Sequence, residues 1–212
     1  MTPMRRIAPF AVLLVLAMLL SGAAWAQGGS MKQENQFEKY ILTKPYLGYV
    51  EARLNELEPP PLLAECPALK VIEREINWMV DDALFAAGAA SPRAGSWIDR
   101  LSVERCGKRA TRNIFITARG TELLPKPMIP GRTATAQQLQ REAVRIAAAQ
   151  ARIKTGCKDE FHVVDSAIDG RYQGGAPWKE DWTVIGCKTT LVLALTFTPD
   201  GRGGSAITAK PK

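Results

Sequence analysis

Two aspartates and one histidine are the residues whose types could support catalysis. Asp81 and Asp165 fall at matching points of two similar pentads, residues 80–84 (VDDAL) and 164–168 (VDSAI). Paired carboxylates can act as general acid and base in glycoside cleavage when they lie about 5–10 Å apart. His162, the one histidine, is three residues from Asp165 and would point to the opposite face of a strand. Since the sequence has no G-x-S-x-G motif, we interpret the aspartates as turn or cap residues and His162 as a sheet residue.

Four cysteines form the second chemically distinctive group: Cys66, Cys106, Cys157 and Cys187. An even number of cysteines in an exported protein indicates disulfide bonds, and four cysteines allow three connectivities. The internal similarity described below favours Cys66 with Cys106 and Cys157 with Cys187. The alternative is a zinc site, but the sequence has no C-x-x-C spacing and a single histidine. It also has no glycine-rich loop leading into a helix, so we expect neither a metal nor a cofactor.

Basic residues are concentrated between residues 93 and 132. The chain has a formal net charge of +7, and this segment contains nine basic and three acidic residues, which gives it +6. A basic field attracts anions, such as phosphorylated lipid head groups, acidic polysaccharide or an acidic protein. The alternative is a solvated basic face without a partner. The residues predicted to contact an anionic partner are Arg105, Lys108, Arg109 and Arg112.

The first 26 residues have the pattern of a signal peptide. Two arginines precede an apolar run, residues 7–20, and a small-x-small cleavage site ends at Ala26. A membrane anchor is the alternative, but the run is shorter than the roughly 20 apolar residues of a spanning helix. We therefore expect a periplasmic or secreted chain that begins at Gln27, without a transmembrane segment after cleavage and without a nucleic-acid partner.

Two stretches of the chain, residues 97–120 and 178–201, resemble each other at a constant offset. Each begins with a tryptophan, Trp97 or Trp178, reaches a cysteine nine residues later and ends on a glycine. Such self-similarity indicates two copies of one supersecondary unit; the alternative is coincidence between two amphipathic hairpins. A tryptophan at this point could stack on a sugar, but we favour packing in the core beside a disulfide.

Helices and antiparallel strands are the elements that would position these residues. Apolar spacing predicts one helix over residues 45–57, ended by three prolines, and another over residues 135–155, capped by Thr135. The predicted apolar face of the second helix comprises Leu139, Ala143, Ile146 and Ile153. Alternation and β-forming residues predict strands at residues 76–84, 97–106, 110–118, 161–168, 182–187, 190–198 and 205–209.

These elements predict an α+β protein of two tandem similar units. Each unit is a helix followed by about three antiparallel strands, closed by a disulfide. The pattern leaves open whether the strands form one shared sheet or two. The predicted division is a signal peptide (1–26), a flexible N-terminal segment (27–44), a first unit (45–120), a connector rich in proline and glycine (121–132), a second unit (133–209) and a tail (210–212).

The sequence favours a non-enzymatic exported protein with a binding or structural role at the cell envelope. It would contact an anionic envelope component or a protein through the basic segment. The first alternative is an envelope glycan hydrolase that uses Asp81 and Asp165. The second is an inhibitor or interaction module that presents the glycine-rich loop, residues 169–177.

Overall fold

The structure, a computed structural model, describes residues 33–212, with the side chain of Ile76 excepted. The predicted signal peptide, residues 1–26, lies outside the described residues, and so do residues 27–32. In the part that is described, no helix has both the length and the apolar composition needed to cross a membrane.

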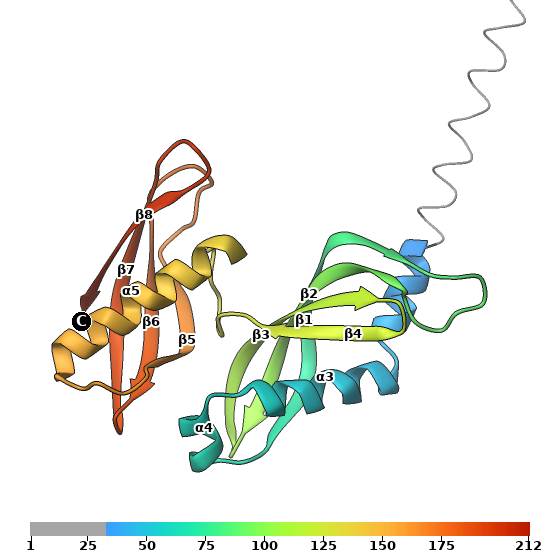
Figure 1. Cartoon of the computed structure of the whole chain (residues 1–212), viewed down its shortest axis with the longest axis horizontal. Coiled ribbons are helices and arrows are strands. Elements are labelled where there is room, and N and C mark those ends of the chain that lie inside the picture. The colour runs from blue at the N-terminus through green and yellow to red at the C-terminus, as the bar shows by residue number, and fades with distance from the viewer. Residues whose placement is uncertain (1–32) are drawn as a thin grey trace, which may run out of the picture.

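Within residues 33–212, the framework consists of two four-stranded antiparallel sheets, each with a helix packed against it (Figure 1). Strands that are neighbours in a sheet are also neighbours in the chain. The predicted α+β class is confirmed, and the strands form two sheets rather than one. A first helix at residues 33–41 is followed by the helices α3 (Lys44–Leu57), α4 (Pro60–Glu65) and α5 (Gln137–Thr155). The first sheet comprises β1 (Leu69–Leu84), β2 (Ala94–Arg105), β3 (Lys108–Arg119) and β4 (Glu122–Pro127); the second comprises β5 (His162–Asp169), β6 (Trp178–Gly186), β7 (Thr189–Pro199) and β8 (Ser205–Pro211).

Residues 33–41 form a helix within the segment that was predicted to be flexible, residues 27–44. Phe37 and Ile41 are buried and lie four residues apart, so they share one side of this helix. The Phe37 ring packs edge-on against the Trp97 ring, with 5.0 Å between the centroids. Two apolar residues in a polar stretch anchor this helix. Two positions are too few to show a helical periodicity in the sequence.

The strand β4 runs through the predicted connector, residues 121–132, so each sheet has four strands rather than about three. Pro125 and Pro127 lie in this strand, opposite Ile116 and Ile114. Because β4 pairs with β3 alone, it is an edge strand, where a residue without a backbone N–H is tolerated. The two prolines therefore belong to an edge strand and not to the loop that they indicated in the sequence.

The first core lies between α3 and the sheet β1–β4. Val50 and Leu54 of α3 are buried, as their spacing predicted. Trp97 is fully buried, and its indole N–H donates a hydrogen bond of 2.7 Å to the Tyr46 hydroxyl. This tryptophan is thus a core residue and not an exposed platform for a sugar ring.

The second core lies between α5 and the sheet β5–β8, and alanines form the helical side of it. Ala143, Ala147 and Ala151 are fully buried, and their small side chains allow α5 to lie close to the sheet. Ile153, which was predicted to belong to this face, is 75% exposed. It follows Ala151 by two residues and so lies roughly 200° around the helix from the alanine stripe. The apolar face of α5 is therefore set by alanine spacing, and the prediction for Ile153 is wrong.

The buried carboxylate of Asp99 on β2 organises the polar groups of the first core. It accepts hydrogen bonds from the Tyr46 hydroxyl and the Asn77 amide, and one of its oxygens lies 3.3 Å from Arg74 Nε. The Arg74 guanidinium also lies over the Tyr46 ring, 5.5 Å from its centroid. A buried carboxylate with such partners ties α3 to the first two strands.

The buried carboxylate of Glu180 on β6 has a similar place in the second core. Its donors are the Thr133 and Thr135 hydroxyls, the Ala134 N–H and the indole N–H groups of Trp178 and Trp182. The Thr135 hydroxyl thus binds Glu180 rather than the first turn of α5, where the N-cap is Ala136 without a side-chain cap. The predicted capping role of Thr135 is wrong, because a buried carboxylate from another element binds its hydroxyl.

We expect the stability of the fold to decline above about pH 10 because of two tyrosines. Burial, and after it Asp99, raises the pKa of the Tyr46 hydroxyl well above its usual value. Burial likewise raises the pKa of Tyr40 to about 12. Both hydroxyls lose their protons at about pH 10 in the unfolded chain but keep them in the folded chain. The contribution of the two tyrosines to the free energy of unfolding is therefore complete below that pH and is lost as the pH rises above it. Urea denaturation across this range should show the decline, and Tyr46→Phe should flatten it; an unchanged decline in that variant would contradict the assignment.

Two disulfides join the segment that follows a helix to the turn of a hairpin. Cys66 bonds to Cys106 with 6.1 Å between the Cα atoms, and Cys157 bonds to Cys187 with 6.4 Å. This is the connectivity favoured among the three that the sequence allowed. Each disulfide connects the helical layer to the centre of its sheet, because the hairpins β2–β3 and β6–β7 hold the second cysteine of each pair.

Candidate functional site

The segment between the two sheets, residues 128–132, is hydrogen-bonded to both of them. The Gly131 N–H donates to the carbonyl of Thr111 on β3, at 3.1 Å. The next residue, Arg132, donates its N–H to the carbonyl of Ser166 on β5, at 2.7 Å. Because consecutive residues bind different sheets, the segment fixes β3 relative to β5.

Gly131 is required where the chain crosses from one sheet to the other. Its φ of +85° lies in the left-handed region, which favours glycine. A Cβ atom at this position would lie 2.2 Å from the carbonyl oxygen of Ser166 and 2.4 Å from its nitrogen. Any larger residue would push the segment away from β5, so the close approach of the two sheets depends on this glycine.

A cavity of about 480 Å³ lies between the two halves of the chain. Its walls come from the end of α3 and the start of α4 (within residues 54–60), from Arg112 and Asn113 on β3, and from residues 126–130, 137–144 and 160–163. Both sheets and the three helices α3, α4 and α5 thus contribute to it. The volume falls in the range of about 300–1,000 Å³ that is typical of small-molecule sites.

The interior of the cavity is mainly apolar, and its buried polar groups already have partners. The Asn113 amide donates to the carbonyls of Ile129 and Gly131, at 2.7 and 2.8 Å. The Gln140 side chain accepts from the Ile129 N–H at 3.2 Å and donates to the Thr135 carbonyl at 3.1 Å. A ligand would therefore meet apolar side chains here. They include Leu54, Leu57, Met128, Val144, Phe161 and Val163.

Two of the cations that line the cavity are exposed and unpaired. Glu58 and Arg112 are buried and form a bidentate ion pair, so their charges offset each other. Lys126 and Arg141 are exposed, and neither has an ion-pair partner within residues 33–212. The exposed charges of the lining are thus these two cations and the carboxylate of Glu160, which together give +1.

His162 also lines the cavity, at the start of β5. Its side chain is partly buried, and its Nε2 lies 3.9 Å from a carboxylate oxygen of Glu160. The sheet position agrees with the interpretation from sequence, which gave no indication that this residue borders a cavity.

The four residues predicted to contact an anionic partner do not share one exposed surface. Arg105 and Arg112 are buried, and both guanidinium groups interact with Glu58. Arg105 also donates to the carbonyls of Leu62 and Cys66. These two arginines are unavailable to an external anion, because they join the chain after α3 to the sheet. The other two predicted residues, Lys108 and Arg109, are exposed beside the β2–β3 turn, and their contact with an anion stays a prediction.

Substitution separates these two classes of basic residue. Arg112→Ala leaves the buried Glu58 carboxylate without its bidentate partner and should lower the free energy of unfolding by about 3 kcal/mol. Lys108→Ala removes a side chain that is 83% exposed and should change it by no more than about 0.5 kcal/mol. Urea denaturation of both variants provides the comparison. Equal effects of the two changes would show that Arg112 is not held in the ion pair described.

Asp81 and Asp165 are exposed and lie on different sheets, on β1 and β5. Asp81 pairs with Ser96, one residue before Trp97, whereas Asp165 pairs with Thr183, five residues after Trp178. The two aspartates therefore lie at different levels of their sheets, and the equivalence predicted from the pentads is wrong. Asp81 accepts a hydrogen bond from the Ser96 hydroxyl, as a local structural residue would. Neither aspartate lines the cavity.

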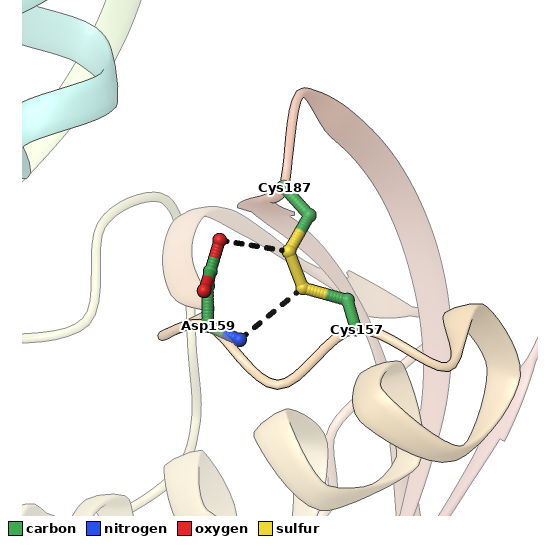
Figure 2. Close-up of side chains that lie close together, drawn as sticks. All are labelled: Cys157, Asp159 and Cys187. Atoms are coloured by element: carbon green, nitrogen blue, oxygen red, sulfur yellow. Dashed lines mark hydrogen bonds between the residues drawn. A yellow bond between two sulfur atoms is a disulfide. The ribbon is translucent and has the colours of Figure 1, made fainter.

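Cys157, Asp159 and Cys187 form the one group of potential metal ligands found in the described part of the chain, as Figure 2 shows. The Asp159 N–H donates to Cys157 Sγ at 3.3 Å, and its carboxylate lies 3.2 Å from Cys187 Sγ. The two sulfurs are bonded to each other, and a metal requires thiolates. In the oxidised protein this group is therefore a disulfide with a neighbouring carboxylate.

No family model, curated protein or solved structure matches this chain.

The sequence did not predict the cavity, although two parts of the cavity lining lie in segments that the sequence had singled out. Lys126 lies in the basic segment, and residues 125–130 have the prolines that were interpreted as a connector. Arg141 lies on the polar side of a correctly predicted helix. No local pattern relates these residues, because the cavity forms only where the two sheets meet.

The glycine-rich loop, residues 169–177, follows β5 and is mostly exposed. Tyr172 in this loop is 44% exposed, and its ring packs edge-on against Trp178 at 5.5 Å. The loop is thus attached to the second core at one point. Its use as an interaction element stays a prediction.

Proposed function

We propose that this chain is an exported, non-enzymatic binding protein of the cell envelope, and that it holds a small ligand in the cavity between its two sheets. The pattern of residues 1–26 supports export, and two disulfides suit an oxidising compartment. The single observation that carries the proposal is the apolar cavity of about 480 Å³ to which both halves contribute.

The way in which the cavity is built supports a binding role. Its walls are attached to each other through residues 128–132, so the cavity does not depend on a ligand to bring the sheets together. Its buried amides bind backbone groups of the wall, and the space between is left to apolar contacts. A preformed apolar cavity with a few polar groups is the usual form of a small-molecule site.

The test uses Nile red, a neutral apolar dye whose fluorescence increases in an apolar environment. The purified protein should bind the dye in a saturable manner. Val144→Trp and Leu57→Trp, which add a large ring to the lining from α5 and from α3, should each weaken binding by about tenfold or more. Ala149→Trp places the same ring on an exposed position of α5 and should have no effect. Unchanged binding in both cavity variants, with folding verified by circular dichroism, would reject the proposal.

We further propose that the two sheets with their helices are copies of one unit. Trp97 pairs with Ile116 on the adjacent strand as Trp178 pairs with Phe197, at the spacing found in the sequence. Asp99 and Glu180, each two residues after its tryptophan, are both fully buried carboxylates. When the two halves are superposed, β2–β3 should overlay β6–β7 with Trp97 on Trp178. A best superposition in any other register would contradict duplication.

A further inference from the structure

We infer that the ligand of this cavity is an amphipathic anion, with an apolar chain in the interior and one carboxylate or phosphate group at the exposed side. The inference rests on the proposed function and specifies the ligand's chemical class. It follows from the distribution of charge, from the use of the buried polar groups and from the position of α5.

The ionised side chains that line the cavity favour an anion. Lys126, Arg112 and Arg141 against Glu58 and Glu160 give the lining a net formal charge of +1. Because Arg112 is bound by Glu58 in the interior, the net charge comes from the exposed side chains Lys126, Arg141 and Glu160. The exposed cations, Lys126 and Arg141, remain free to bind an oxygen of the ligand through charge-assisted hydrogen bonds.

The interior favours an apolar chain over a polar molecule. Asn113 and Gln140 are the buried amides of the lining, and their donors are directed to carbonyls of residues 129, 131 and 135. A sugar or a polar peptide placed here would lose its hydrogen bonds to water without gaining replacements, which is costly. An alkyl chain has no such groups to satisfy and gains from the removal of its surface from water.

The start of α5 adds to the preference for negative charge. Gln137, the first residue of this 19-residue helix, lines the cavity. The N–H groups of its first turn have no side-chain acceptor at the N-cap, Ala136, since the nearby Glu180 carboxylate binds residues 133–135 instead. Arg141 follows one turn later, so the helix end and the cation lie on the same wall.

A displacement series with matched head groups tests the charge preference. Bound Nile red is titrated with decanoate, decyl phosphate, decanol and decylammonium, which share one alkyl chain. Decanoate and decyl phosphate should displace the dye at concentrations about tenfold lower than decanol, because a charge-assisted hydrogen bond contributes on this scale. Decylammonium should be the weakest competitor. A carboxylate or a phosphate preference would each support the inference, and their order would distinguish a fatty-acid ligand from a phosphorylated one.

Charge-reversed variants identify the residues that bind the head group. In Lys126→Glu/Arg141→Glu, the advantage of decanoate over decanol should disappear, while displacement by decanol stays within about threefold of the original. The matched control is Lys179→Glu/Arg145→Glu, which reverses two exposed cations that do not line the cavity and should keep the advantage.

The outcomes separate this inference from the proposed function. Equal displacement by decanol and decanoate, with Nile red binding still lost in the cavity-filling variants, would overturn the anionic ligand and leave a neutral one. An advantage of decanoate that persists in Lys126→Glu/Arg141→Glu would also overturn it. Nile red binding that is insensitive to the cavity-filling variants would instead reject the cavity as a site.

Discussion

Replacing Glu180 with alanine is expected to lower the free energy of unfolding by about 5 kcal/mol. The Glu180 side chain is fully buried and accepts hydrogen bonds from five donors on two segments of the chain. Without the carboxylate, two indole N–H groups and the Thr135 hydroxyl would remain buried and unpaired, and the partly buried Thr133 hydroxyl and Ala134 N–H would lose their acceptor. A buried donor without a partner costs about 1–3 kcal/mol, and partial rearrangement reduces the sum.

The measurement is urea denaturation followed by tryptophan fluorescence, since Trp178 and Trp182 are direct partners of Glu180. Glu180→Gln should lie between the original protein and the alanine variant, because one oxygen acceptor remains. Glu142→Ala, at an exposed position of α5, is the control and should change stability by less than about 0.5 kcal/mol. A loss below about 1 kcal/mol for Glu180→Ala would show that the five hydrogen bonds are not formed together.

Removing the Cys66–Cys106 disulfide should have the second largest effect. The bond closes a loop with a sequence separation of 40. In the chain-entropy model such a cross-link stabilises the folded state by about 4 kcal/mol, because it restricts the unfolded chain. The double variant Cys66→Ala/Cys106→Ala should therefore lose about that amount, measured by thermal or urea denaturation against the original protein kept oxidised.

The single variants provide the control for this disulfide. Cys66→Ala and Cys106→Ala should each lose nearly as much as the double variant, since either change breaks the same bond. Treatment of the original protein with a reductant should give a larger loss than the double variant, because it also opens Cys157–Cys187. A reductant that leaves the denaturation curve unchanged would contradict the contribution of both bonds.

The parts of the fold that the sequence predicted are those with strong local patterns. The helix α3 shows apolar spacing within its own 14 residues, and the two hairpins with their cysteines show alternation and a shared spacing. Each pattern reports on neighbours within about one element, which is the range over which periodicity is informative. The disulfide connectivity followed because the two similar stretches favoured one pairing.

The parts that were missed depend on partners far away in the chain. Arg112 looks like a surface cation in the sequence and is buried because Glu58, 54 residues earlier, pairs with it. Thr135 looks like a helix cap, but the carboxylate of Glu180 binds its hydroxyl. The cavity is the extreme case, since it requires the approach of segments that have no common motif. Tertiary contacts override local preference at all three places.

The measurement that tests the central claim most directly is an amide NMR titration of the purified protein with decanoate. The account predicts saturable shifts that are largest in three segments, residues 126–130, 137–144 and 160–163, which line the cavity from both halves of the chain. In Val144→Trp, the same additions of decanoate should no longer give saturable shifts in these segments. Shifts that are largest elsewhere, for example at the exposed residues Trp78 and Val80 of β1, would contradict a ligand site between the sheets.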